Sequence, residues 1–389
     1  MSAIRTKTLT VAGALAQKPH AGGHTWALLQ YVLGFRQLGW NVLFLDQIDA
    51  RMCTDAAGQP CPPEDSIQAR YFHDVMTRFD LQDACALVVD GGQFLGLSRP
   101  RVLERLGASA FLLNIMGYLQ IDDLLAAVPA RVFLDIDPGF GQMWKALGLH
   151  DPFRGHDAHV TIGLRIGEPD CPIPTGGISW ITTPQPIALD YWPVTPRVTD
   201  GPFTSVASWR GANGPVTFEG RTYGLRVHEF RKFAALPALT GRPFAVALDI
   251  HADDARDRDL LIANGWRLDD PRQAAGDPDA YQAYIQGSAA EFLTAKNMYV
   301  QTNSGWISDR SLCYLASGRP VLAQDTGFGA IYPTDAGLLR YRTLDDACAG
   351  VEAICAGYDR QARAARMVAT EIFDATRVLG RLLAALGVS

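Results

Sequence analysis

The sequence predicts an α/β protein made of two similar halves, each with a parallel sheet between layers of helices. Three observations predict this fold class. Short apolar runs alternate with segments of helical periodicity early in the chain, a proline-rich segment interrupts the series at residues 169–202, and a second alternating series follows it. Apolar runs that alternate with helices are typical of parallel strands joined by crossover helices. The 389 residues are enough for two such halves.

The first half opens with a strand, a glycine-rich turn and a long helix. Residues 8–15 form an apolar run, the turn spans residues 17–23, and residues 25–39 carry apolar side chains at helical spacing. A strand rich in β-branched and aromatic residues is predicted directly afterwards, at residues 40–47. Three further apolar runs, each ending at small or acidic residues, complete the predicted sheet: residues 84–92, 109–117 and 130–139.

The second half alternates in the same way, although no repeat is visible in the sequence. Its predicted strands are residues 203–211, 243–251, 260–268, 297–305 and 319–327. Its predicted helices are residues 227–236, 279–296 and 308–318. One or two further helices are predicted within residues 362–386, with no strand after them.

These patterns predict the boundaries of the domains. The first domain is expected over residues 1–168 and the second over residues 203–368. Residues 169–202 are rich in proline and poor in helix formers, which indicates an ordered crossover between the two. A helix over residues 369–389 closes the chain and could pack back on the first domain.

Composition restricts the class of protein and its surroundings. The formal charge is -6, which argues against a clustered basic face for nucleic acid. No stretch approaches the ~20 apolar residues of a membrane helix, and residues 1–17 are interpreted as a first strand rather than a signal peptide. The seven cysteines are odd in number and lack C-x-x-C spacing, so a reducing, cytoplasmic location is expected. Nothing in the sequence indicates an oligomeric state.

Two segments, one in each half, resemble those of a known family. Residues 19–46, PHAGGHTWALLQYVLGFRQLGWNVLFLD, are similar to the opening strand, loop and helix of GT-B glycosyltransferases. Residues 303–329, NSGWISDRSLCYLASGRPVLAQDTGFG, are similar to their nucleotide-sugar segment, in which a helix ends in a small residue followed by Gly-x-Pro-Val. The resemblance implies two Rossmann-like domains that face each other across a cleft, with helices at the C-terminus.

The resemblance also implies an activity. GT-B enzymes transfer a sugar from a nucleotide sugar, linked to UDP, GDP or dTDP, to an acceptor. The expected partners are therefore a small-molecule donor and acceptor, with no permanently bound cofactor. Many retaining members carry two glutamates eight positions apart, where this chain has Gly305 and Cys313. The run Ser304-Gly305-Trp306 is instead similar to the Cys-Gly-Trp core of inverting natural-product glycosyltransferases, with Asn303 in place of the preceding histidine.

A donor site needs groups that hold a diphosphate. A helix N-terminus and positive or hydroxyl side chains serve this purpose, and Ser308 is a predicted N-cap with Arg310 in the first turn. The loop after the next strand and the turn after the first strand of the second half offer further contacts. The candidate donor-binding residues are Gly23, Arg210, Trp266, Ser304, Gly305, Trp306, Ser308, Asp309, Arg310, Asp325, Thr326 and Gly327.

Transfer to a hydroxyl also calls for a general base opposite the donor. His24 is the first candidate because it follows the first strand and an imidazole titrates near neutral pH. Asp137, after another strand, is the second catalytic candidate, either orienting a histidine or contacting the acceptor. His20, Asn114 and His156 are the candidate acceptor-side residues.

Three charged or polar clusters have structural interpretations. Asp135 and Asp137 match the spacing of a metal-binding Asp-x-Asp motif, but the interpretation favoured here is a site without metal. The histidine-rich run at residues 150–159 is spaced irregularly, which favours a polar loop over metal ligation. The basic run at residues 226–232 is predicted to be a solvated helix face, from which Arg231 and Lys232 could reach a phosphate.

Three functions are consistent with these features. The leading hypothesis is a metal-independent glycosyltransferase with His24 as candidate base. The second is a sugar-nucleotide epimerase or hydrolase of the same fold, which would consume donor without an acceptor. The third is a non-catalytic nucleotide-sugar-binding protein, which the absence of the glutamate pair would allow.

Overall fold

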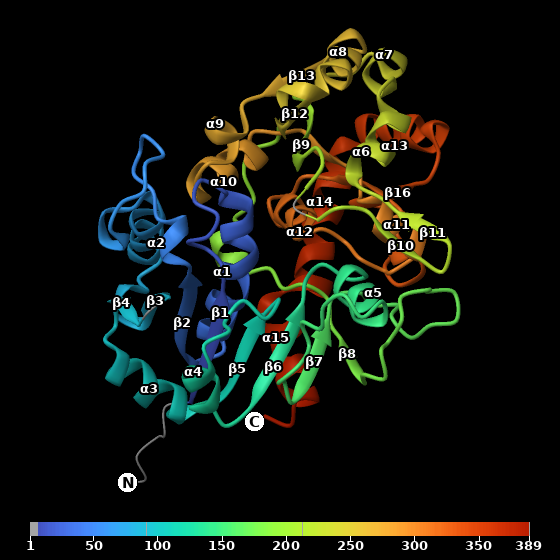
Figure 1. The fold of residues 1–389 in the computed structure, drawn as a ribbon. Helices are drawn as coiled ribbons and strands as arrows, with labels where there is room; N and C mark the ends of the chain where they lie inside the picture. The colour runs from blue at the N-terminus through green and yellow to red at the C-terminus, as the bar shows by residue number, and fades with distance from the viewer. Residues whose placement is uncertain (1–6, 91, 212, 389) are drawn as a thin grey trace.

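The computed structural model describes residues 7–90, 92–211 and 213–388 of the chain. Within this part, the chain forms two separate main sheets, one in each half, with helices against them (Figure 1). The first sheet has eight strands in the order β4-β3-β2-β1-β5-β6-β7-β8, and the second has six in the order β13-β12-β9-β14-β15-β16. The α/β prediction of two sheet-based halves is confirmed.

The first sheet is parallel except where β4 runs antiparallel to β3. Its strands are β1 (Thr8–Gly13), β2 (Asn41–Ile48), β3 (Cys85–Val89), β4 (Gln93–Gly96), β5 (Ser109–Ile115), β6 (Arg131–Asp135), β7 (Ala158–Thr161) and β8 (Trp180–Thr182). The associated helices are α1 (Gly22–Gln37), α2 (Ile67–Arg78), α3 (Arg99–Ala108), α4 (Asp122–Ala126) and α5 (Phe140–Ala146). The central strands are buried almost throughout because helices cover both faces, which explains their unbroken apolar sequences.

The second sheet is entirely parallel. Its strands are β9 (Phe203–Ser208), β12 (Phe244–Asp249), β13 (Trp266–Asp269), β14 (Ala290–Leu293), β15 (Val321–Gln324) and β16 (Leu338–Tyr341), and a separate hairpin joins β10 (Val216–Phe218) to β11 (Arg221–Tyr223). The helices are α6 (Arg226–Phe230), α7 (Leu236–Thr240), α8 (Ala255–Ala263), α9 (Pro271–Ala275), α10 (Pro278–Gln286), α11 (Asn297–Thr302), α12 (Asp309–Ala316), α13 (Leu344–Ala356) and α14 (Tyr358–Val368).

Three predicted elements of the second half differ from the structure. The first part of the strand predicted over residues 260–268 is the end of α8, and β13 begins at Trp266. The helix predicted over residues 279–296 ends early, and β14 occupies its second part, between β9 and β15. Alanine, glutamate and leucine favour helices, but burial inside the sheet overrides that preference. The strand predicted over residues 297–305 is instead the short helix α11, which ends at Asn303 in a left-handed conformation. The candidate residues from Ser304 onward therefore follow a helix rather than a strand.

The crossover and the C-terminus both return to the first half. Strand β8, which lies within the predicted crossover, pairs with β7 of the first sheet. Ile187 forms backbone hydrogen bonds to the chain around Phe373 and Ala375, just before α15 (Ala375–Ala385). Helix α15 packs on α1, where a Cβ at Gly34 would overlap Leu379 and Ala375. The last helix thus packs against the opening helix of the chain. Among the described helices, none is long and apolar enough to span a bilayer.

Candidate active site

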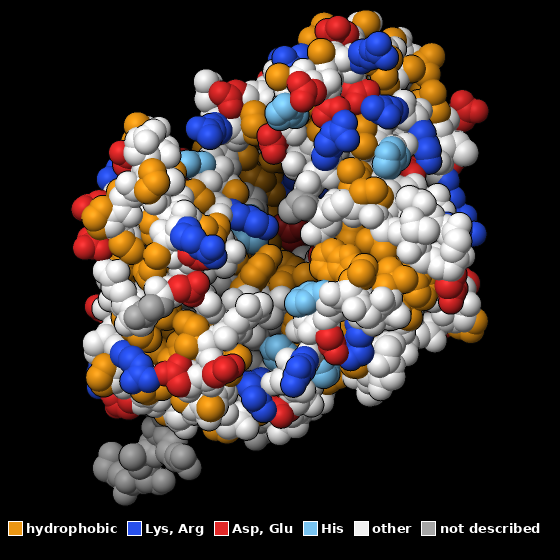
Figure 2. Space-filling view, viewed as in Figure 1, with side chains coloured by type: hydrophobic (Ala, Val, Ile, Leu, Met, Phe, Trp, Pro, Cys, Tyr) orange, Lys and Arg blue, Asp and Glu red, His pale blue; other side chains and the backbone are white. Residues whose placement is uncertain are grey.

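A cleft separates the two halves, and Figure 2 shows it as a hollow near the middle of the molecule. It contains two chambers. The aromatic chamber, of about 410 Å³, lies against the carboxyl ends of β5 and β6 and is defined by Tyr118, Ile136 and Trp144. The strand-end chamber, of about 600 Å³, includes Ser208 and Asp249 at the ends of β9 and β12. Four residues line both chambers and so mark their junction: His24, Arg226, Asp309 and Arg310. Ligands of open α/β sheets bind at such strand ends.

The loop between β1 and α1 brings the first half against the second. A Cβ at Gly22 would overlap the backbone of Asp277, and one at Gly23 would overlap the ring of Tyr281. On the following turn of α1, the indole Nε1 of Trp26 donates to the carbonyl of Pro278, at 2.9 Å. The two glycines therefore permit a close approach that places His24 at the junction. Gly23 itself lines the strand-end chamber, as does His20.

His24 is held as a neutral imidazole. Its Nε2 lies 3.1 Å from the carbonyl oxygen of Ala14, so Nε2 carries the proton and Nδ1 is the proton acceptor. Burial and the positive charge of Lys18 lower the pKa of His24 to about 3. The expectation that His24 titrates near neutral pH is therefore wrong, although its place at the cleft agrees with the candidate role.

Two cations line the cleft, Arg226 at the junction and Lys18 in the aromatic chamber. Among the described residues, no carboxylate forms an ion pair with Arg226 or Lys18, and the Nε of Arg226 has no hydrogen-bond partner. Burial and the charge of Arg310 lower the pKa of Arg226 to about 10. Arg226 is the first residue of α6, which is anchored by the bond from the Gly224 amide to the side chain of Asn297, at 2.7 Å.

Arg310 is the buried counterpart of these cations. Its Nε donates to Glu291 at 2.6 Å and its Nη1 to the carbonyl of Val206 at 2.6 Å, whereas Nη2 has no partner among the described residues. Ser308 caps α12, as predicted, by accepting from the Arg310 amide at 3.3 Å. Asp309 lies beside it at the junction, where burial raises the pKa of its carboxyl group.

Asp137 bridges the two halves rather than standing free. Its carboxylate accepts from the Lys296 ammonium at 2.7 and 3.0 Å, from the Tyr299 hydroxyl, and from the Asn213 amide at 3.2 Å. The ring of Tyr299 stacks on Trp306, with centroids 4.3 Å apart. Trp306 thereby lines the aromatic chamber, and Asp137 acts as a positioning residue for the docked halves.

Several other candidates lie outside the chambers. Trp266 is buried in the core, packs on Phe244 and donates to the Ala234 carbonyl, so it cannot stack on a bound base. Arg210 forms an ion pair with Asp254. Neither of these two candidates lines either chamber.

The loop that follows β15 is likewise occupied by internal contacts. Asp325 forms ion pairs with Arg340 and Arg342. The hydroxyl of Thr326 donates to the carbonyl of Trp306, and its own carbonyl accepts from the Gly305 amide at 2.8 Å. Ser304 is buried, and the adjacent residues pack closely, since a Cβ at Gly327 would overlap Asn303. This loop supports the wall around Trp306 without lining either chamber.

The predicted acceptor-side residues have structural partners. Asn114 is fully buried and forms hydrogen bonds in both directions with the backbone of Leu119, each at 3.0 Å. Its Nδ2 also lies 3.1 Å from Nε2 of His156, whose Nδ1 is 3.2 Å from the carbonyl of Phe153. Both side chains therefore support residues that line the aromatic chamber, such as Phe153, and do not line it themselves. Within the described ranges, no group of three His, Cys, Asp or Glu side chains could hold a metal ion.

The sequence identified Arg310 but neither Arg226 nor Lys18 among the basic residues that line the cleft. Arg231 and Lys232, the candidates for phosphate contact, instead pair with Asp257 and Glu229. Arg226, assigned to a solvated face, lines both chambers. The only local signal for Arg226 is that it begins a helix after the short turn that follows a hairpin. No feature of the sequence around Lys18, in the glycine-rich turn, indicates that this residue lines the cleft.

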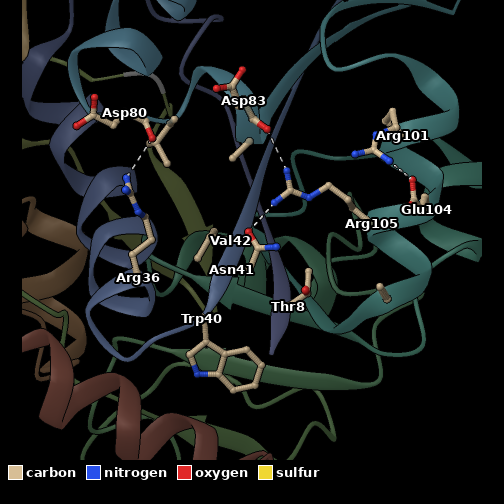
Figure 3. Close-up of a pocket in the computed structure, with 13 residues that line it drawn as sticks. Thr8, Arg36, Trp40, Asn41, Val42, Asp80, Asp83, Arg101, Glu104 and Arg105 are labelled. Atoms are coloured by element: carbon tan, nitrogen blue, oxygen red, sulfur yellow. Dashed lines mark hydrogen bonds and ion pairs between the residues drawn. The ribbon is translucent and has the colours of Figure 1, made fainter. Parts of the chain in front are cut away.

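Another hollow, of about 590 Å³, lies at the amino ends of strands β1 and β2 of the first sheet (Figure 3). It includes Asn41, at the amino end of β2. Its arginines are occupied: Arg36 donates to the carbonyl of Phe79, Arg105 donates to Asn41 at 2.8 Å, and Arg101 pairs with Glu104. Because it lies away from the carboxyl ends of the strands, we assign the candidate site to the cleft.

The fold has close counterparts among solved structures, whereas no protein-family model and no curated sequence matches the chain. An alpha-glucosyltransferase solved with UDP-glucose and DNA containing an abasic site is 11% identical, with a TM-score of 0.60 over 98% of this chain and 99% of that one. AviGT4, a glycosyltransferase involved in avilamycin A biosynthesis, is 13% identical, with a TM-score of 0.53 over 97% and 96% of the two chains. Alr3699/HepE of Anabaena, solved with UDP, is 10% identical, with a TM-score of 0.52 over 98% and 100%.

Similarity at these identities concerns the fold, and it extends over nearly the whole chain. The similarity covers both sheet-based halves, since it spans 98% of this chain. The protein therefore has the GT-B fold of glycosyltransferases.

Proposed function

We propose that the protein is a glycosyltransferase that moves a sugar from a nucleotide-sugar donor to a small-molecule acceptor. The observation that carries this proposal is that Arg226, which has no ion-pair partner among the described residues, lies beside the buried Arg310 at the junction of the two chambers. An apolar or neutral ligand would leave the charge of Arg226 uncompensated, whereas a diphosphate would compensate it. The fold and the nucleotides bound to its structural counterparts agree with this assignment.

The strand-end chamber is the proposed site for the nucleotide. Its volume is within the range of small-molecule sites, and Ser208, Asp249 and Arg272 offer polar contacts for a base and a ribose. The diphosphate would lie at Arg226 and Arg310. The transferred sugar would then lie at the junction, between Asp309 and His24, where Asp309 can accept from its hydroxyl groups.

The proposed reaction replaces one bond at the anomeric carbon of the sugar. The bond from this carbon to the diphosphate oxygen breaks, and the electron pair leaves with the diphosphate, whose charge Arg226 and Arg310 stabilise. The acceptor oxygen forms the new bond and gives its proton to Nδ1 of His24, the candidate base. The donor itself adds negative charge near His24, which opposes the lowering of its pKa by Lys18. Metal independence is part of the proposal.

A thermal-shift panel of UDP, GDP and dTDP, with and without EDTA, tests the donor site. We expect one nucleotide to raise the melting temperature, with the same shift when EDTA is present, because the charge is held by side chains. The absence of a shift with all three would contradict the donor site. Mixing the matching nucleotide sugar with the protein alone distinguishes the related functions: consumption without acceptor identifies an epimerase or hydrolase, and binding without any turnover identifies a binding protein.

The pH dependence of transfer tests the state of His24. Because its pKa in the free protein is about 3, His24 is already neutral at pH 5, and raising the pH to 8 does not change its protonation. We therefore expect kcat/KM to show no ionisation of His24 between pH 5 and 8. His24→Gln should lower kcat about 100-fold and leave the shape of the pH profile unchanged in this range. Initial rates of nucleotide release measure both. An acid limb near pH 6.5 that disappears in His24→Gln would show that His24 titrates normally.

A further inference from the structure

The wall of the aromatic chamber that belongs to the first half is mainly apolar. Met116 and Tyr118 follow β5, Ile136 follows β6, and Trp144 lies on α5, and all four are half-buried along the chamber. Phe153 is buried with them at the same wall. A flat, apolar surface of a ligand would gain area burial and ring contacts here.

The carboxylates of this wall have little capacity left for a ligand. In Asp137, Oδ1 accepts from Lys296 and Tyr299, and Oδ2 accepts from Lys296 and Asn213. A carboxylate offers about four acceptor positions, so those of Asp137 are filled.

Asp135 is similarly engaged inside the protein. Its Oδ2 accepts from Gln142 at 2.6 Å and from Thr161 at 2.9 Å, and its Oδ1 accepts from the Asp137 amide at 3.1 Å. The acceptor positions of Asp137 are filled and three of those of Asp135 are filled, so the two acids leave a ligand about one acceptor position. At this wall a sugar acceptor would find few free carboxylate acceptors for its hydroxyl groups.

The apolar character continues onto the surface. Leu147 is 42% exposed and Leu149 is 71% exposed, in the segment between α5 and His150, which lines the chamber. Figure 2 shows apolar side chains gathered beside the hollow, over the region of α5 and β10. The rim defined by Leu147 and Leu149 therefore adjoins the chamber in sequence through His150.

From this geometry we propose that the acceptor carries its hydroxyl group on a hydrophobic ring system. The ring lies against Trp144 and Tyr118, and the hydroxyl group reaches His24 at the junction. The proposal rests on the proposed transferase function and specifies the class of acceptor. Trp144 is then a residue that determines acceptor specificity.

Calorimetric titration with two hydroxyl compounds, 2-naphthol and methyl β-glucopyranoside, tests this class. The protein is first saturated with the nucleotide that stabilises it. We expect 2-naphthol to bind about tenfold or more tightly than the glucoside, and Trp144→Ala to weaken 2-naphthol by about tenfold without changing nucleotide affinity. Equal affinities, no binding of 2-naphthol, or no effect of Trp144→Ala would overturn the proposal.

Surface variants provide a control that cannot be attributed to misfolding. Leu149→Ser at the rim should weaken 2-naphthol binding, whereas Leu239→Ser should not, because Leu239 is 61% exposed on α7 of the other half. Failure of the proposed function would appear separately, as the absence of nucleotide binding. In that case the same titration without nucleotide decides whether the ring site exists: binding that depends on Trp144 supports it, and no such binding refutes it.

Discussion

Replacing Glu291 with glutamine is expected to lower the free energy of unfolding by about 3 to 5 kcal/mol. The side chains of Glu291 and Arg310 are 0% and 8% exposed, and their ion pair spans 2.6 Å. Glutamine keeps the shape but removes the charge, so the guanidinium would stay buried without compensation. Urea unfolding followed by circular dichroism measures the loss.

An exposed ion pair provides the matched control. Arg101 and Glu104 are 65% and 63% exposed, so Glu104→Gln should change the free energy of unfolding by less than about 1 kcal/mol. Equal losses in the two variants would show that burial does not set the contribution of the Glu291–Arg310 pair. Equal losses would also remove the reason for regarding the Arg310 guanidinium as held in place at the cleft by Glu291.

Local pattern predicted the layered fold but not every strand of it. The apolar runs at β1, β2, β5 and β6 were recognisable because buried parallel strands need apolar residues on both faces. Strand β14 was missed because Glu291 and its neighbours favour a helix, and the glutamate is tolerated in the sheet only because Arg310 compensates it. That compensation joins residues on different elements, which local spacing does not reveal.

The same reason limits prediction of the site. His24 and Arg310 were identified because each follows a recognisable local feature, a glycine-rich turn and an N-cap. The ion pair between Asp137 and Lys296 joins the two halves across the cleft, and the sequence gives no sign of how the halves dock. Trp266 illustrates the opposite case, a residue predicted to contact a ligand that lies in the core. A tryptophan at a strand end is suitable for either place, and Trp266 is buried.

Replacing Arg226 with methionine is expected to weaken binding of the stabilising nucleoside diphosphate by about 10- to 150-fold. A hydrogen bond to a charged group contributes about 1.5 to 3 kcal/mol, and Arg226 has no carboxylate partner among the described residues that would reduce its charge. The corresponding nucleoside, which lacks phosphates, should bind both proteins equally. Calorimetric titration of each ligand measures the difference.

Arg231→Met separates this local effect from a general loss of positive charge. Arg231 follows the same short helix, but its guanidinium forms an ion pair with Asp257. The variant therefore removes the same charge as Arg226→Met and should leave diphosphate affinity within about twofold, because exposed charges are screened by salt. If both variants weakened the diphosphate alike, the net charge of the second half would account for binding. If neither did, the diphosphate would not lie at the junction, and His24 would lose the neighbouring leaving group that its proposed role requires.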